Sequence, residues 1–186
     1  IAKARADFAA TSGGPVAAGK FADRMSGVLP GIGVVPATVP AIEAHLAELL
    51  DDLERHFAMH PYLLGGRPSI ADCALIGPFY AHLYLDAAPG RLLRERAPLT
   101  CHWIERMNHP DPDENGAWLD DDALADTMRP FLARIGADAS PYVLDTVRAY
   151  EAWADARPAD VTEPPRAVGF HQSTLRGVAF GRYTSP

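Results

Sequence analysis

An all-α fold is predicted by two segments of this 186-residue sequence and by its composition. Residues 41–59 place their apolar side chains on one stripe at helical spacing, with charged side chains elsewhere. Residues 69–86 form a second helical pattern that is apolar almost all round, which is typical of a helix in the middle of a bundle. Alanine, leucine and arginine are abundant and strand formers are sparse, which also favours helices.

Composition limits the classes of partner and the compartment. The formal net charge of −7 and the pI near 5.4 argue against a nucleic-acid-binding role. The sequence has two cysteines, and neither a signal peptide nor a transmembrane run is recognisable. We therefore expect a reducing, cytoplasmic setting without membrane contact. The first residue is Ile1 and the helical pattern has already begun there, so we expect the chain to be part of a longer polypeptide.

Glycine and proline divide the first part of the chain. Residues 1–10 and 15–25 are expected to form short helices, separated by a glycine pair. Residues 26–40 contain three prolines and three glycines, so we expect a long apolar loop there that lines a site. The strongly amphipathic helix over residues 41–59 should end before Pro61, since a residue that precedes proline is disfavoured in helical geometry.

The helix that starts at residue 69 has a recognisable cap. Ser69 is followed three residues later by Asp72, which is a capping-box pattern with aspartate in place of the usual glutamate. The Ser69 hydroxyl should accept a hydrogen bond from the Asp72 N–H, and the Asp72 carboxylate should accept one from the Ser69 N–H. Such a cap contributes about 1–2 kcal/mol. Gly65 and Gly66 allow a tight reversal before it, and Pro68 fixes the entry angle.

Two further helical segments follow at residues 91–97 and 98–107, after a break predicted at residues 88–90. Leu99, Trp103 and Met107 share one face of the second segment. A bend is expected at Pro78 in the preceding helix.

The last third of the chain is expected to contain two more helices and a tail. The first opens at residues 120–122 and should be kinked at Pro130. Its predicted buried stripe comprises Leu119, Leu124, Met128, Phe131, Leu132 and Ile135. The second should start at Ser140-Pro141, run to about residue 156 and turn three side chains inward, namely Leu144, Val147 and Tyr150.

Several residues invite a chemical interpretation. His56 and His60 have the spacing of two metal ligands on one helix face, but without a visible third ligand a capping or surface role is favoured and no metal site is predicted. Cys73 lies in a first helical turn, which favours a thiolate, but its apolar neighbours favour core packing. Neither Cys73 nor Cys101 has a neighbouring pattern that would activate it.

Three aromatic residues also leave an alternative open. Phe79, Tyr80 and Tyr84 could line an apolar ligand site or fill the bundle. Core packing is favoured, since aromatic stripes usually belong to the core.

Two phrases of the sequence together resemble a known family. Tyr62–Ala74, with its Leu-Leu-Gly-Gly-x-Pro-Ser-Ile-Ala-Asp run, resembles the loop and helix start in the C-terminal, all-helical domain of glutathione S-transferases. Pro98–Met107 is similar to a second phrase of that domain, in a slightly compressed form. The resemblance implies a structural folding role for Ser69 and Asp72 rather than a catalytic one.

The resemblance covers residues 1–110 and gives the expected domain organisation. We expect a glutathione-transferase C-terminal-like helical domain there, additional helices packed on the bundle over residues 111–157, and an extended or hairpin-like tail over residues 158–186.

The family pairs this helical domain with an N-terminal thioredoxin-like domain that holds glutathione and stabilises its thiolate. No βαβ pattern and no thiol-activating residue is recognisable in this sequence, so the resemblance implies that the chain alone is not catalytic. It implies a contribution to the wall of a pocket for an apolar electrophile, and to a homodimer interface, with glutathione as co-substrate. The wall residues expected are Phe21, Arg24 and Met25, with the Val28–Val35 loop.

The sequence leaves other classes of function open. A non-catalytic helical module that mediates protein assembly is one alternative, and a small-ligand binder that uses the loop at residues 26–40 is another.

Overall fold

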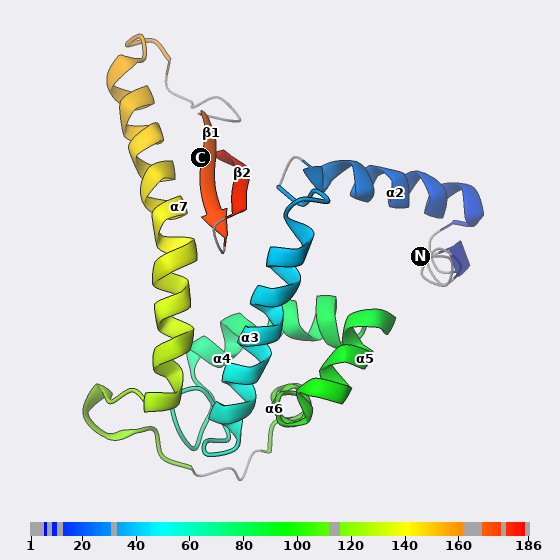
Figure 1. The fold of residues 1–186 in the computed structure, drawn as a ribbon, viewed down its shortest axis with the longest axis vertical. Helices are drawn as coiled ribbons and strands as arrows, with labels where there is room; N and C mark the ends of the chain where they lie inside the picture. The colour runs from blue at the N-terminus through cyan, green and yellow to red at the C-terminus, as the bar shows by residue number, and fades with distance from the viewer. Residues whose placement is uncertain are drawn as a thin grey trace. The chain divides into compact units, whose positions relative to one another are not determined.

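The computed structural model describes residues 6, 9–10, 13–30, 33–111, 116–161, 169–175 and 178–184 (Figure 1). The all-α fold class is confirmed, since every regular element described between residues 15 and 156 is helical. Most of the helix expected over residues 1–10 lies outside the described residues. The chain divides into two compact units, Glu43–Ala137 and the combination of Ile1–Ile42 with Asp138–Pro186.

Helices α2 (Pro15–Val28) and α3 (Val39–Phe57) shorten the predicted loop between them. Pro15 opens α2, where its missing N–H costs no helical hydrogen bond. Pro40 lies in the first turn of α3 for the same reason, so the prediction that the loop extends to residue 40 is wrong. Thr38 closes the loop before α3, because its hydroxyl donates to the Gly33 carbonyl at 2.7 Å.

The capped helix changes its geometry at the proline. It begins as α4 (Ile70–Pro78) and continues as the π-helical turn η2 (Phe79–Tyr84). Pro78 has no N–H to donate and its ring crowds the preceding turn, so the chain continues in the wider π-helical turn at the position where the sequence predicts a bend.

Helices α5 (Ala87–Arg96) and α6 (Pro98–Asn108) follow closely. The predicted break at residues 88–90 was wrong, since Pro89 occupies the first turn of α5, where no N–H is needed. Gly90 permits close packing there, because a Cβ atom at this position would lie 2.5 Å from the Tyr84 carbonyl oxygen.

After α6 the chain forms two short 3-10 turns, η3 (Asp120–Asp122) and η4 (Asp126–Met128), and then one long helix, α7 (Arg129–Ala156). Pro130 is the second residue of α7 and therefore starts this helix instead of kinking it. The predicted helix boundary at Pro141 was also wrong, since α7 continues through it.

The buried stripe predicted for this part of the chain was only partly right, because several of its members are exposed. Met128 is 4 % exposed and Phe131 packs against the core, whereas other members are substantially exposed. The 3-10 turns before α7 break the helical period for the members that precede this helix, whereas Leu132 and Ile135 lie within α7 on a side that the core does not cover. The exposed members are Leu124, Leu132 and Ile135, and the three side chains expected inward from the next segment, Leu144, Val147 and Tyr150, are exposed as well.

The final elements are two antiparallel strands, β1 (Gly169–Leu175) and β2 (Val178–Thr184). Their register pairs Gly169 with Thr184 at one end and Leu175 with Val178 at the other.

The core of the Glu43–Ala137 unit is built around Trp103 of α6. Its ring stacks on Phe57 of α3 at a centroid distance of 5.2 Å and meets the ring of Phe79 edge-on at 6.0 Å. α6 packs against α4, η2 and α5. The fully enclosed members of this core include Leu50, Leu53, Tyr62, Leu63, Leu93 and Ile104.

The central helix of this unit is therefore α6, and the sequence-based expectation for the capped helix was wrong. One face of α4 is exposed, with Ile70 at 87 % and Cys73, Ala74 and Gly77 beside it. Apolar character all round a helix predicts burial only where neighbours cover every face, and α4 turns just its Asp72 side to the core.

Candidate functional site

Helix α2 presents the three residues predicted to line an electrophile pocket. Phe21, Arg24 and Met25 share one helix face at the spacing i, i+3, i+4. All three are exposed, Phe21 at 47 % and Met25 at 51 %, and Val28 continues the same face. The geometry brings the three together as an accessible, mainly apolar surface, and their role in a pocket stays a prediction.

The N-terminus of α4 carries the reciprocal hydrogen bonds of a capping box. The Ser69 N–H donates to Oδ2 of Asp72 at 2.9 Å, and the Ser69 hydroxyl accepts from the Asp72 N–H at 3.4 Å. The same hydroxyl donates to Asp72 Oδ2 at 2.6 Å. Asp72 is fully buried, so its carboxylate depends on these donors in place of water.

Asp72 also binds two partners outside the cap. Its Oδ1 accepts hydrogen bonds from the Leu63 N–H and from the Trp103 indole N–H, each at 3.0 Å. A buried indole needs an acceptor, and this contact joins α4 to α6 through the carboxylate. The capping pattern gave no indication of this link, because its partners lie 9 and 31 residues away.

His56 is buried in α3 instead of having the capping or surface role that the sequence favoured. Its Nε2 lies 3.0 Å from the Tyr62 carbonyl oxygen, which accepts only, so Nε2 carries the proton. Its Nδ1 then accepts from the Thr127 hydroxyl at 2.8 Å. The ring of His60 stacks on His56 at 5.1 Å. Both nitrogens of the neutral ring are satisfied, which suits a structural role.

The stability of the fold is expected to depend on pH through His56. Burial is the main effect and lowers the pKa of His56; the hydrogen bond to the Tyr62 carbonyl opposes it, and the smaller effects of His60 and Asp72 lower and raise the pKa, respectively. Below the unfolded-state pKa of about 6.5 the unfolded chain binds this proton more readily, so stability is lost as pH falls through the lowered folded-state pKa. Urea unfolding at about pH 7.5 and about pH 5.5 should show this loss. It should be smaller in His56→Gln, and an equal loss in the variant would contradict the assignment.

The two cysteines lie in different environments. Cys73 is exposed on α4, so the prediction of core packing was wrong, and Cys101 is buried. Burial raises the pKa of the Cys101 thiol, which makes it a poor nucleophile at neutral pH. Among the described residues, no group of three His, Cys, Asp or Glu side chains could hold a metal ion.

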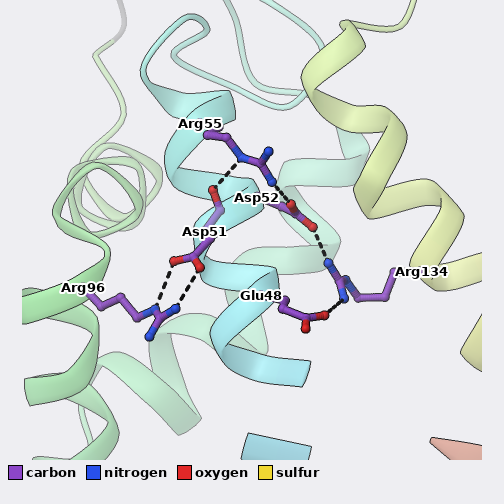
Figure 2. A network of polar contacts seen from close by, with 6 residues as sticks. All are labelled: Glu48, Asp51, Asp52, Arg55, Arg96 and Arg134. Atoms are coloured by element: carbon purple, nitrogen blue, oxygen red, sulfur yellow. Dashed lines mark hydrogen bonds and ion pairs between the residues drawn. The ribbon is translucent and has the colours of Figure 1, made fainter. Parts of the chain in front are cut away.

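A charged network joins α3 to α5 and α7 (Figure 2). Arg96 of α5 forms a two-point hydrogen bond with Asp51, at 3.0 and 2.7 Å. On the other side of α3, Arg134 of α7 pairs with Asp52 and, at 2.8 Å, with Glu48. Asp52 is 4 % exposed and also pairs with Arg55. Arg134 therefore fastens the start of α7 to this unit.

Arg134→Ala is expected to lower the free energy of unfolding by about 1–3 kcal/mol, since it removes a major partner of the buried Asp52 carboxylate. The matched control is Arg129→Ala, which removes an ion pair with Asp126 whose side chains are 74 % and 91 % exposed. That change should stay within about 0.5 kcal/mol. Chemical denaturation of both variants measures the difference, and equal losses would show that the network contributes no more than a surface pair.

A cavity of about 350 Å³ opens between η2 and α6. The rings of Tyr80 and Tyr84 are stacked at 6.2 Å with an interplanar angle of 24°. Ile104 is fully buried and supplies apolar surface. The complete lining is Tyr80, Tyr84, Leu85, Ile104, Glu105, Asn108 and His109. The interpretation of the aromatic cluster as core holds for the buried Phe79 and for the half-buried Tyr84, which packs against the core and also lines the cavity, whereas Tyr80 is exposed at the cavity.

The polar side of this cavity centres on Glu105. The Tyr84 hydroxyl donates to Glu105 Oε1 at 2.7 Å, and this contact raises the pKa of Tyr84, with the Arg94 guanidinium opposing. Arg94 lies over the Tyr84 ring at 4.6 Å and donates to the Tyr84 carbonyl at 3.4 Å. Tyr84 thus stays a neutral donor that holds Glu105 at the cavity wall. Phe21, Arg24 and Met25 are not among the residues that line this cavity.

Within the described part of the chain, no helix is long and apolar enough to span a membrane. Comparisons with curated proteins and with solved structures found no match. A comparison with protein families found one: residues 36–107 match the model of the glutathione S-transferase C-terminal domain. The matched range includes the capping box, the Asp72–Trp103 contact and helices α4 to α6. Over residues 36–107 the chain is therefore similar to the glutathione S-transferase C-terminal domain.

Proposed function

We propose that this chain is the C-terminal helical part of a glutathione S-transferase-like protein, and that it contributes an electrophile-pocket wall and dimer contacts to glutathione conjugation. The observation that carries the proposal is the family match over residues 36–107. The exposed face of α2 formed by Phe21, Arg24 and Met25 supports the wall, since an apolar electrophile needs accessible apolar surface. The two free cysteines, Cys73 and Cys101, are consistent with a cytoplasmic protein.

Glutathione itself does not fit the described cavity. The tripeptide carries carboxylates, which need cationic or N–H donors, whereas Glu105 is the charged residue of this lining and no lysine or arginine belongs to it. The buried Cys101, with its raised pKa, does not replace an activated thiolate. We therefore propose that the glutathione site lies outside this cavity, in a thioredoxin-like domain joined to this chain, as the family resemblance implies.

The proposal is tested on the full-length product of the gene. That product should be retained on immobilised glutathione and should conjugate glutathione to an apolar aryl halide, whereas the 186-residue chain alone should do neither. Phe21→Ser should raise KM for the aryl halide with little change in kcat, because it removes apolar binding surface without touching the thiolate. A reading frame that starts at or near Ile1, or a full-length product without retention, would overturn the proposal.

The exposed face of α4 favours a second candidate, a helical module for protein assembly. Ile70 is 87 % exposed, and Cys73, Ala74 and Gly77 extend the same apolar face. In that case the full-length product would bind a protein partner without thiol-transfer activity, and Ile70→Lys would abolish the pull-down. Conjugation activity together with unchanged assembly in Ile70→Lys would exclude this candidate.

A further inference from the structure

The cavity between η2 and α6 combines aromatic surface with one fixed negative charge. Tyr80 is 36 % exposed and presents ring surface beside the buried Ile104. With histidine counted as neutral, Glu105 is the one formally charged residue of the lining. Its Oε1 accepts a hydrogen bond from the Tyr84 hydroxyl at 2.7 Å, which orients the carboxylate at the cavity wall.

Charge and size together define the class of ligand. Aromatic faces beside a carboxylate attract an organic cation, because the cation forms a cation–π interaction with the ring and an ion pair with the carboxylate. Arg94 already lies over Tyr84 at 4.6 Å, but it does not line the cavity, so the charge that faces a ligand is that of Glu105. A volume of about 350 Å³ suits a small bicyclic aromatic molecule.

We propose that this cavity binds a small aromatic ammonium compound, with its ring against Tyr80 and Ile104 and its ammonium group at Glu105. The site needs neither glutathione nor the α2 wall, so it goes beyond the proposed conjugation function. Binding at this site is a property of the Glu43–Ala137 unit, which contains every lining residue.

The test titrates the full 186-residue chain with three naphthalene probes of the same ring size. The probes are 1-naphthylmethylammonium, the neutral 1-naphthylmethanol and the anionic 1-naphthoate. Calorimetry or NMR chemical-shift changes measure the binding of each probe. The ammonium probe should bind about tenfold more tightly than naphthoate. Glu105→Gln should lower the affinity for the ammonium probe by about fivefold to tenfold. It should change the affinity for naphthylmethanol by less than about twofold, since glutamine keeps the acceptor for the Tyr84 hydroxyl.

Two further variants complete the test. Glu95→Gln removes the same charge from an exposed position on α5, where the side chain is 68 % exposed, and should leave ammonium binding unchanged. Tyr80→Leu should weaken the binding of both the ammonium and the neutral probe, because it removes the ring surface that both probes contact. Glu105 is exposed, so its variant should fold normally, and its urea midpoint verifies this. Tighter binding of naphthoate, absence of binding by all three probes, or equal losses in Glu105→Gln and Glu95→Gln would overturn the assignment.

Discussion

Replacement of Asp72 by alanine is expected to lower the free energy of unfolding by about 3–5 kcal/mol. The variant loses the acceptor for the N–H groups of Leu63 and Ser69 and for the Trp103 indole, all of which bond to the buried carboxylate. A buried donor left without a partner costs about 1–3 kcal/mol. Urea unfolding followed by tryptophan fluorescence measures the loss.

Two comparisons make the Asp72 result specific. Asp72→Asn keeps one acceptor oxygen but places an amide group against a donor, so an intermediate loss is expected. Asp86→Ala is the matched control, because Asp86 stands at the N-cap of α5 without a side-chain cap hydrogen bond. Its replacement should change stability by less than about 0.5 kcal/mol.

The ligand affinity of the folded Asp72→Ala protein distinguishes a structural role of Asp72 from a role in binding. Its affinity for 1-naphthylmethylammonium should match that of the wild type, since Asp72 does not line the cavity. A large loss of affinity with intact stability would instead identify Asp72 as a binding residue.

Local sequence signals predicted the elements that depend on neighbours in the chain. The reciprocal bonds between Ser69 and Asp72 span three residues, so the spacing alone indicates them. The amphipathic α3 and the start of α6 at Pro98 follow equally local rules. Prolines gave the clearest errors, because a proline in a first turn starts a helix whereas the same residue elsewhere breaks one.

The candidate site depended on contacts that no local pattern encodes. Tyr84 and Glu105 are 21 residues apart, and their hydrogen bond exists because η2 packs on α6. A π-helical turn after Pro78 also changes which side chains of η2 share a face, so helical spacing could not place Tyr80 and Tyr84. The hydrogen bond of His56 to Thr127 likewise joins residues that are 71 positions apart.

The segment after α6 completes the unit by pairing with the loop before the capping box. The Gly66 N–H donates to the Ala117 carbonyl at 2.7 Å, and the Leu119 N–H donates to the Leu64 carbonyl at 3.0 Å. Trp118 forms an isolated β-bridge with Gly65 and lies under the Arg67 guanidinium at 4.2 Å. The sequence predicts a tight reversal at the pair Gly65 and Gly66. The structure shows in addition that the backbone of residues 116–119 approaches these two glycines closely.

Gly65→Ala is therefore expected to destabilise the fold by about 2–4 kcal/mol. Gly65 has a φ of +123°, which a side chain disfavours. A Cβ atom there would also lie 2.9 Å from the Leu119 nitrogen and 3.0 Å from the Ala117 carbonyl oxygen. Because backbone atoms cannot yield as a flexible side chain does, the paired segment must move away and lose its hydrogen bonds.

The matched control is Gly77→Ala in α4, which should have the opposite sign. A Cβ atom at Gly77 meets nothing within 4 Å, and alanine is the better helix former by about 1 kcal/mol, so this variant should be slightly more stable. Urea unfolding compares the two, and hydrogen exchange at the Gly66 and Leu119 amides shows whether the paired segment has opened in Gly65→Ala. Fast exchange at these amides with the α6 amides still protected would show that the segment detaches from an intact bundle. Unchanged exchange and unchanged stability would contradict the close backbone approach, and with it the claim that residues 116–119 complete the Glu43–Ala137 unit.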